Sequence, residues 1–154
     1  LCPQVIRRPS RPERYVQIST RIMHSMEQFT PEIEIFSVDE VFLDVTKSQR
    51  LFGDPLTIAK RVKETIFTVS GVKASVGVAD SKLIAKWAAK LDKPDGLVLI
   101  EPNTAKQRLK NVPVTDICGI NKGIAKHLAA HGAFTCGEIG PPPTAGACNR
   151  VIVP

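Results

Sequence analysis

Two adjacent carboxylates, Asp39 and Glu40, are the residues of this chain best suited to chemistry. They follow Ser37 and Val38 between two short apolar segments. Carboxylates at such a junction can bind Mg²⁺, a hard cation that takes oxygen ligands and leaves positions open for substrate phosphates. Taken alone, the pair is also typical of a solvated acidic turn, where Asp is common. The tetrapeptide therefore predicts either a magnesium site or an exposed turn.

Both segments beside the carboxylates alternate as half-buried β-strands do. Residues 32–36 alternate Glu with Ile, and residues 41–45 place Val41, Leu43 and Val45 on one face. A strand pair of this kind would hold the carboxylates at the lip of a sheet.

A second group of candidate residues is a column of lysines on a predicted helix, residues 81–91. Lys82, Lys86 and Lys90 recur at four-residue spacing, and Lys93 follows in a stiff Lys-Pro-Asp-Gly turn. A solvated helix face is the alternative for the column. A lysine fixed at the same sheet edge as metal-binding acids would suit a triphosphate.

A third candidate is a glycine-containing turn between two short predicted helices. Its residues are Gly119, Ile120, Asn121, Lys122 and Gly123. Such a turn lets backbone N–H groups and the following helix N-terminus approach a nucleic-acid phosphate without reading base sequence. A plain helical hairpin is the alternative.

Composition limits the class of protein. The formal net charge of +6 and pI of about 9.3 favour a polyanionic partner. No apolar run approaches the roughly 20 residues of a membrane span, so no membrane association is expected. Four scattered cysteines, without a Cys-x-x-Cys pair, argue against zinc and a disulfide framework and favour reduced thiols in the cytoplasm.

Apolar spacing predicts the order helix, strand, strand, helix, strand, helix, strand up to residue 100. The predicted helices are 11–29, 55–69 and 81–91, and the predicted strands are 32–36, 41–45, 73–79 and 97–100. The adjacent strand pair argues against a purely parallel sheet, which leaves an α+β or α/β layer with helices on one face of a mixed sheet.

The second part of the chain has a different pattern. Residues 101–103 mark a domain boundary, and short helices are predicted beyond it over 104–109, 114–118, 124–131 and 135–139. The Pro- and Gly-rich tail, 140–154, is expected to be disordered. The first residues lack an initiator Met, which predicts that the chain is part of a longer protein.

Taken together, these segments resemble the Y-family, or translesion, DNA polymerases, most closely the DNA polymerase IV (DinB) branch. Residues 36–46, Phe-Ser-Val-Asp-Glu-Val-Phe-Leu-Asp-Val-Thr, are similar to the family's Y-S-I-D-E-A-F-L-D-V-T. Four further segments are similar to family motifs in the same order: 74–79, 81–86, 93–96, and 112–114 with 119–120. The similarity runs from about residue 11 to residue 139.

The resemblance implies a ferredoxin-like polymerase palm of α+β class over residues 11–101, with a mixed or antiparallel sheet. Residues 102–139 would be a partial helical thumb with a helix-hairpin-helix-like turn. Residues 1–10 would be the end of a preceding fingers segment, and 140–154 the disordered tail.

The resemblance also assigns an activity, the Mg²⁺-dependent addition of dNTPs to a primer 3′-hydroxyl during damage tolerance and DNA repair. Asp39 and Glu40 would bind the two Mg²⁺ ions, and Lys93 the incoming triphosphate. The DNA-binding residues would be Lys82 and Lys86 with Gly119, Ile120, Asn121, Lys122 and Gly123. The partners would be primer–template DNA and dNTP in the bacterial cytoplasm, and the sliding clamp through segments outside this chain.

This sequence also departs from the family pattern. The motif that carries the family's first metal-binding Asp, and the fingers domain after it, are not in the chain. We therefore expect the isolated chain to be inactive and its sheet to have an unpaired edge. Asn121 stands where the family has Gly. A non-catalytic DNA-binding homologue and, less favoured, a palm-type nucleotide cyclase remain alternatives.

Overall fold

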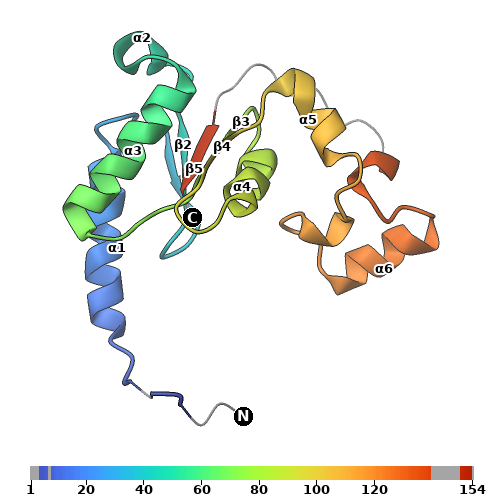
Figure 1. Cartoon of the computed structure of the whole chain (residues 1–154), viewed down its shortest axis with the longest axis horizontal. Helices are drawn as coiled ribbons and strands as arrows, with labels where there is room; N and C mark the ends of the chain where they lie inside the picture. The colour runs from blue at the N-terminus through green and yellow to red at the C-terminus, as the bar shows by residue number, and fades with distance from the viewer. Residues whose placement is uncertain (1–3, 7, 140–149, 154) are drawn as a thin grey trace.

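A five-stranded mixed sheet lies at the centre of the fold (Figure 1). This computed structural model describes residues 4–6, 8–139 and 150–153. The strands are β1 (Ile33–Ile35), β2 (Val41–Asp44), β3 (Val76–Ala79), β4 (Leu97–Leu99) and β5 (Arg150–Val153), in the spatial order β1-β2-β5-β3-β4. Helices accompany the sheet, so the predicted α+β class is confirmed.

Three strands begin at the same edge of the sheet. Strands β2 and β3 both run antiparallel to β5, so they share one direction, and β4 is parallel to β3. The segments that precede β2, β3 and β4 therefore meet at one edge, which we call the leading edge. Residues 37–40, 73–75 and 93–96 are these segments.

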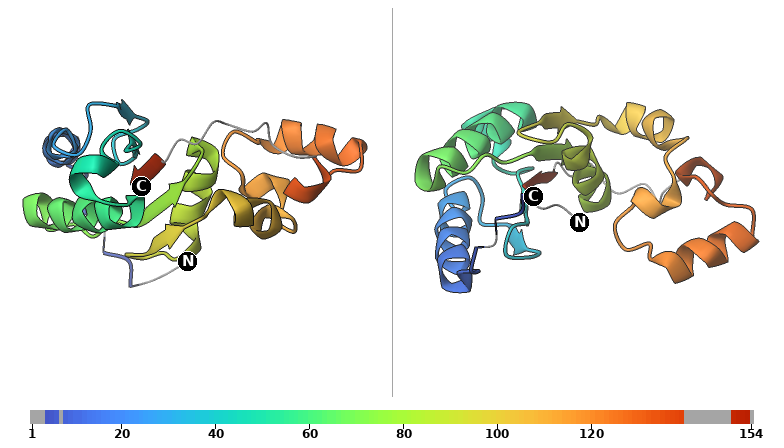
Figure 2. Two further views of the ribbon diagram at one scale, coloured as in Figure 1. Left: turned by 90° about the horizontal axis from the view of Figure 1, so that it is seen from above. Right: turned by 60° about the horizontal axis from the view of Figure 1, so that its bottom comes forward.

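Helices cover both faces of the sheet, not the single face that was predicted. Helices α1 (Pro12–Met26) and α3 (Pro55–Ser70) lie on one side and α4 (Lys82–Leu91) on the other (Figures 1 and 2). The reason is visible in β2, where Val41 and Leu43 join the core under α1 and α3 while Phe42 joins the core under α4. All three side chains are buried, so β2 is apolar on both faces.

Helix α4 approaches β3 closely at Gly77. A Cβ atom at this position would lie 2.0 Å from the carbonyl oxygen of Ala85 and 2.5 Å from the amide nitrogen of Ala89. Only glycine fits there, and the alanines of α4 keep the helix close to the sheet.

Local signals set the ends of α1 and α3 near the predicted positions. Pro12 lies in the first turn of α1, where its missing N–H is not needed. Asp54 caps α3 by accepting hydrogen bonds from the Leu56 and Thr57 amides at 2.9 and 3.0 Å. Gly71 closes α3 in the left-handed region at φ 71°. The short helix α2 (Gln49–Phe52) was not predicted.

The second part of the chain is helical, as predicted. It contains α5 (Pro102–Leu109) and α6 (Lys122–Ala130), and the predicted helices 114–118 and 135–139 are short 3-10 turns at Val114–Asp116 and Cys136–Glu138. None of the helices in the described ranges is long and apolar enough to cross a membrane.

Strand β5 contradicts the prediction of disorder for its part of the tail. Residues 150–153 are Arg-Val-Ile-Val, and three β-branched residues in a row favour a strand. The strand lies between β2 and β3, with Val41 opposite Val153 and Gly77 opposite Ile152. The facing edges of β2 and β3 are therefore paired where an unpaired edge was expected. The rest of the predicted disordered tail, 140–149 and 154, lies outside the described residues.

Candidate active site

The side chains of Asp39 and Glu40 converge on one hydroxyl in the turn between β1 and β2. Ser37 Oγ donates a hydrogen bond to Asp39 Oδ1 at 2.6 Å and lies 3.5 Å from Glu40 Oε2. The amides of Phe36 and Ser37 donate to the Glu40 carbonyl at 3.0 and 3.1 Å, which closes the turn. Two carboxylates and a hydroxyl thus cluster at the leading edge, where Asp39 is exposed and Glu40 half-buried.

This donor set fits Mg²⁺. The cation is usually held by one or two protein carboxylates, with waters and substrate phosphates as its other ligands. Asp39 and Glu40 can supply the carboxylates. Within residues 4–6, 8–139 and 150–153, no group of three or more His, Cys, Asp or Glu side chains could hold a metal ion. The acidic turn therefore offers two carboxylate ligands, and substrate or another segment would have to provide the rest.

Lys86 points toward the acidic turn instead of lying exposed like Lys90. It is 8% exposed, and its Nζ donates to Glu40 Oε2 at 2.5 Å. The same Nζ lies 4.0 Å from the centroid of the Phe36 ring, a cation–π contact. The ammonium thus neutralises Glu40, and contact of Lys86 with DNA stays a prediction.

We expect Lys86→Met to lower the free energy of unfolding by about 3 kcal/mol, because it leaves the half-buried Glu40 carboxylate without its partner. The double variant Lys86→Met/Glu40→Gln should recover most of this loss, since neither charge remains. Urea unfolding followed by circular dichroism measures both. Lys90→Met, exposed on the same helix, is the control, and equal midpoints for Lys86→Met and Lys90→Met would contradict a stabilising ion pair.

A cavity of about 540 Å³ is lined by both Asp39 and Lys93, which are far apart in the sequence. Much of its wall is apolar and includes Tyr15 and Ile22 of α1. Its charged lining residues are Asp39, Lys73 and Lys93. Such a cavity suits a ligand that has both an apolar part and an anionic part.

Sequence reasoning missed Lys73. The signal that could have found it is its position in the sequence. Lys73 lies just before β3 at the leading edge, as Asp39 and Glu40 lie just before β2. Only the strand directions reveal that these segments meet.

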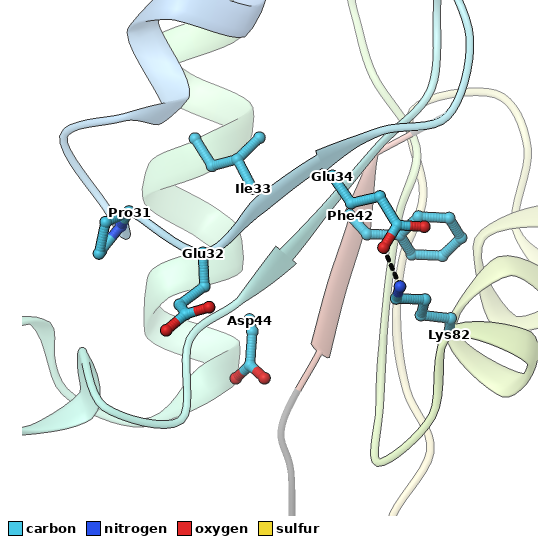
Figure 3. Close-up of a pocket in the computed structure, with 7 residues that line it drawn as sticks. All are labelled: Pro31, Glu32, Ile33, Glu34, Phe42, Asp44 and Lys82. Carbon is cyan, nitrogen blue, oxygen red and sulfur yellow. Dashed lines mark hydrogen bonds and ion pairs between the residues drawn. The ribbon is translucent and has the colours of Figure 1, made fainter.

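Lys82 lies over a different cavity, shown in Figure 3. It forms an ion pair with Glu34 of β1, and its Nζ lies 5.6 Å from the centroid of the Phe42 ring. This cavity of about 260 Å³ is also lined by Glu32 and Asp44, so its surroundings are largely acidic. DNA binding by Lys82 stays a prediction.

The turn at 119–123 lies well away from the acidic turn, at the start of α6 (Figure 1). Gly119 has φ 90°, which favours glycine. Asn121 has φ −81° and caps α6 through its Oδ1, which accepts from the Ile124 amide at 3.0 Å. Asn in place of the family's Gly therefore causes no backbone strain. Ile120 packs against the core under α4, while Lys122 and Gly123 are exposed.

Comparison with known proteins identifies the family. A family model described as the impB/mucB/samB family matches residues 1–90. DNA polymerase IV of Moorella thermoacetica is 42% identical over 139 residues, which cover 90% of this chain and 35% of that protein. DNA polymerase IV of Shewanella frigidimarina is 39% identical over 139 residues, covering 90% and 39%. The chain spans less than half the length of these curated relatives.

Solved structures agree with the sequence relatives. DinB from Sulfolobus solfataricus matches with a TM-score of 0.77 and 31% identity over 89% of this chain and 40% of that chain. An insertion ternary complex of Dbh DNA polymerase matches with a TM-score of 0.78 and 32% identity, over 86% and 39%. The predicted resemblance is confirmed. The chain belongs to the impB/mucB/samB family, within the Y-family DNA polymerases of the DNA polymerase IV (DinB) branch.

Proposed function

We propose that this chain supplies the palm, residues 11–101, and the first part of the thumb, residues 102–139, of a translesion DNA polymerase. The whole protein would add dNTPs to a primer 3′-hydroxyl with Mg²⁺. The observation that carries the proposal is the cavity lined by both Asp39 and Lys93, with the Ser37 hydroxyl between the carboxylates of Asp39 and Glu40. The match to an insertion ternary complex of Dbh DNA polymerase supports DNA and an incoming nucleotide as partners.

Each of these residues would have its own role in nucleotidyl transfer. Asp39 and Glu40 would hold Mg²⁺, which supplies activation of the primer hydroxyl and charge neutralisation at the α-phosphate. Lys93 would place a positive charge against the triphosphate, where negative charge grows as pyrophosphate leaves. Lys86 would hold the Glu40 side chain in the turn, through the contact that it makes in this structure.

The same proposal assigns DNA contacts to the second part of the chain. The exposed turn at 119–123 would hold duplex DNA by its phosphates, with Lys82 as a further candidate DNA contact. Lys86 would contact DNA only after leaving the Glu40 carboxylate. The protein would act in DNA damage tolerance in the bacterial cytoplasm.

A chimera tests this function. The matching region of the Moorella thermoacetica DNA polymerase IV is replaced by residues 11–139 of this chain, so that the host protein supplies the strand that pairs with β2 and β3 in place of β5. Template-directed incorporation is measured with Mg²⁺ and dNTPs. We expect extension by the chimera and none by the 154-residue chain alone, because the acidic turn provides only two carboxylates. Extension by the isolated chain would contradict the proposal. So would a chimera that folds and binds primer–template without extending it, the result that a non-catalytic DNA-binding homologue predicts.

DNA binding by the isolated chain gives a further prediction. Affinity for duplex DNA should fall steeply with salt, and Lys122→Ala should reduce the log–log slope by about 1, the value for one lost phosphate contact. Lys60→Ala, an exposed lysine of α3 on the other part of the chain, should leave the slope unchanged. Fluorescence anisotropy over a salt series measures both. Affinity that does not change with salt would contradict binding through phosphates.

A further inference from the structure

Lys63 of α3 holds the turn that carries Lys93. Its Nζ lies within hydrogen-bond distance of four oxygens: the carbonyl oxygens of Ala74 at 2.6 Å, Asp95 at 2.8 Å and Gly96 at 3.1 Å, and Asp95 Oδ1 at 2.7 Å. The side chain is only 19% exposed. One ammonium thus joins α3 to two segments of the leading edge, the one before β3 and the one before β4.

Contacts of its own backbone also fix the conformation of the turn at residues 93–96. Asp95 has φ 61°, in the left-handed region that is costly for residues other than glycine. The Gly96 carbonyl accepts from the Val76 amide at 2.9 Å. A Cβ at Gly96 would lie 1.9 Å from the Asp92 carbonyl oxygen, so the chain passes too closely for any other residue. A conformation of this kind needs contacts that hold it, and Lys63 supplies several of them.

The Asp95 carboxylate also binds a second lysine, Lys73. Its Oδ2 lies 3.0 Å from Lys73 Nζ, while its Oδ1 binds Lys63. Hydrogen bonds from Lys63 and then Lys73 lower the pKa of the Asp95 carboxyl. The carboxylate thus holds Lys73, which lines the same cavity as Lys93.

We infer that Lys63 is a positioning residue for anion binding at this cavity: it fixes the turn from which Lys93 reaches the cavity and, through Asp95, the place of Lys73. The inference rests on the proposed function, which assigns a triphosphate to Lys93. Lys63 itself is occupied by four oxygens of the protein and is absent from the cavity lining, so it acts through the turn. A turn that is already ordered spares the ligand the cost of ordering it.

Binding of inorganic triphosphate to the 154-residue chain, followed by NMR titration, tests the inference. Lys93→Ala and Lys63→Met should each weaken binding about tenfold, the effect of losing one charge-assisted contact or its preorganisation. The double variant should lose less affinity than the product of the two single losses, because part of the effect of Lys63 acts through Lys93. Lys63→Arg should recover most of the affinity, since it keeps the charge and several donors. Lys60→Met, exposed on the same helix, is the control.

The outcomes separate the two proposals. If Lys93→Ala weakens binding while Lys63→Met binds like the original chain, the positioning role of Lys63 is wrong and the proposed function survives. A double variant that shows the product of both single losses would also overturn the inference, because a merely structural or independent role gives additive free energies. If Lys93→Ala has no effect, the triphosphate assignment fails, and this inference fails with it.

A second variant covers the case in which Lys63→Met does not fold. Asp95→Ala removes the carboxylate that Lys63 and Lys73 share and leaves Lys63 its bonds to the carbonyl oxygens of residues 74, 95 and 96. The same weakening, and the same lack of additivity with Lys93→Ala, are expected. Unchanged triphosphate affinity in a folded Asp95→Ala protein would overturn the inference.

Discussion

Asp39→Asn in the chimera should lower the rate of dNTP incorporation by about a thousandfold, the scale of loss when one preorganised group of an active site is removed. Asn has nearly the same shape as Asp but carries no charge and offers only one oxygen, so it is a poor Mg²⁺ ligand. Asp39 is exposed, and its side chain accepts a hydrogen bond from Ser37, so the fold should tolerate the change.

The measurement is single-turnover incorporation with saturating Mg²⁺ and dNTP. Asp92→Asn is the matched control, since Asp92 is also exposed and lies at the end of α4, outside the cavity that Asp39 lines. Primer–template affinity should be the same for both variants. An Asp39→Asn chimera that incorporates nucleotide at the original rate would show that Asp39 does not bind the catalytic cation.

Removal of residues 140–154 should lower the free energy of unfolding by at least about 3 kcal/mol, because it deletes a central strand with its hydrogen bonds. Strand β5 pairs with β2 on one side and β3 on the other. Without it the β1–β2 pair and the β3–β4 pair are no longer joined through the sheet, and facing backbone groups of β2 and β3 lose their partners.

Urea unfolding followed by circular dichroism measures this loss. Ile152→Pro is a finer variant, since proline inside a central strand removes a ladder donor while the tail stays in place. Deletion of residues 1–10 is the control, because residues 4–6 and 8–10 are exposed. If deletion of 140–154 and deletion of 1–10 give the same midpoint, β5 does not stabilise the sheet.

The order of the elements could be predicted because its signals are local. The apolar stripes of α1 and α3 repeat at helical spacing, and Asp54 and Gly71 mark the ends of α3 within a few residues. The chemistry of Asp39, Glu40 and Lys93 was predicted less directly. Their spacing suggested a magnesium and triphosphate site, with a solvated acidic turn as the alternative. Only the resemblance to Y-family motifs, in the same order along the chain, favoured a polymerase active site.

What could not be predicted depends on contacts between distant segments. Four-residue spacing places Lys82, Lys86 and Lys90 on one stripe of α4, yet only packing against the sheet decides that Lys86 meets Glu40 while Lys90 stays exposed. Strand β5 has a strand-like composition but no local signal of its partners. The bonds of Lys63 likewise arise from the topology, which brings α3 against the leading edge.

Paramagnetic line broadening by Mn²⁺, a substitute for Mg²⁺, tests most directly whether Asp39 and Glu40 form a divalent-cation site at the leading edge. Broadening in NMR spectra of the 154-residue chain detects weak binding, which suits a site with two carboxylates. The amide signals of residues 37–41 should broaden first, followed by those of 93–96, and Asp39→Asn should abolish the effect. Broadening that instead centres on Glu32, Glu34 and Asp44, the acidic residues of the cavity in Figure 3, or that survives Asp39→Asn, would contradict the metal assignment.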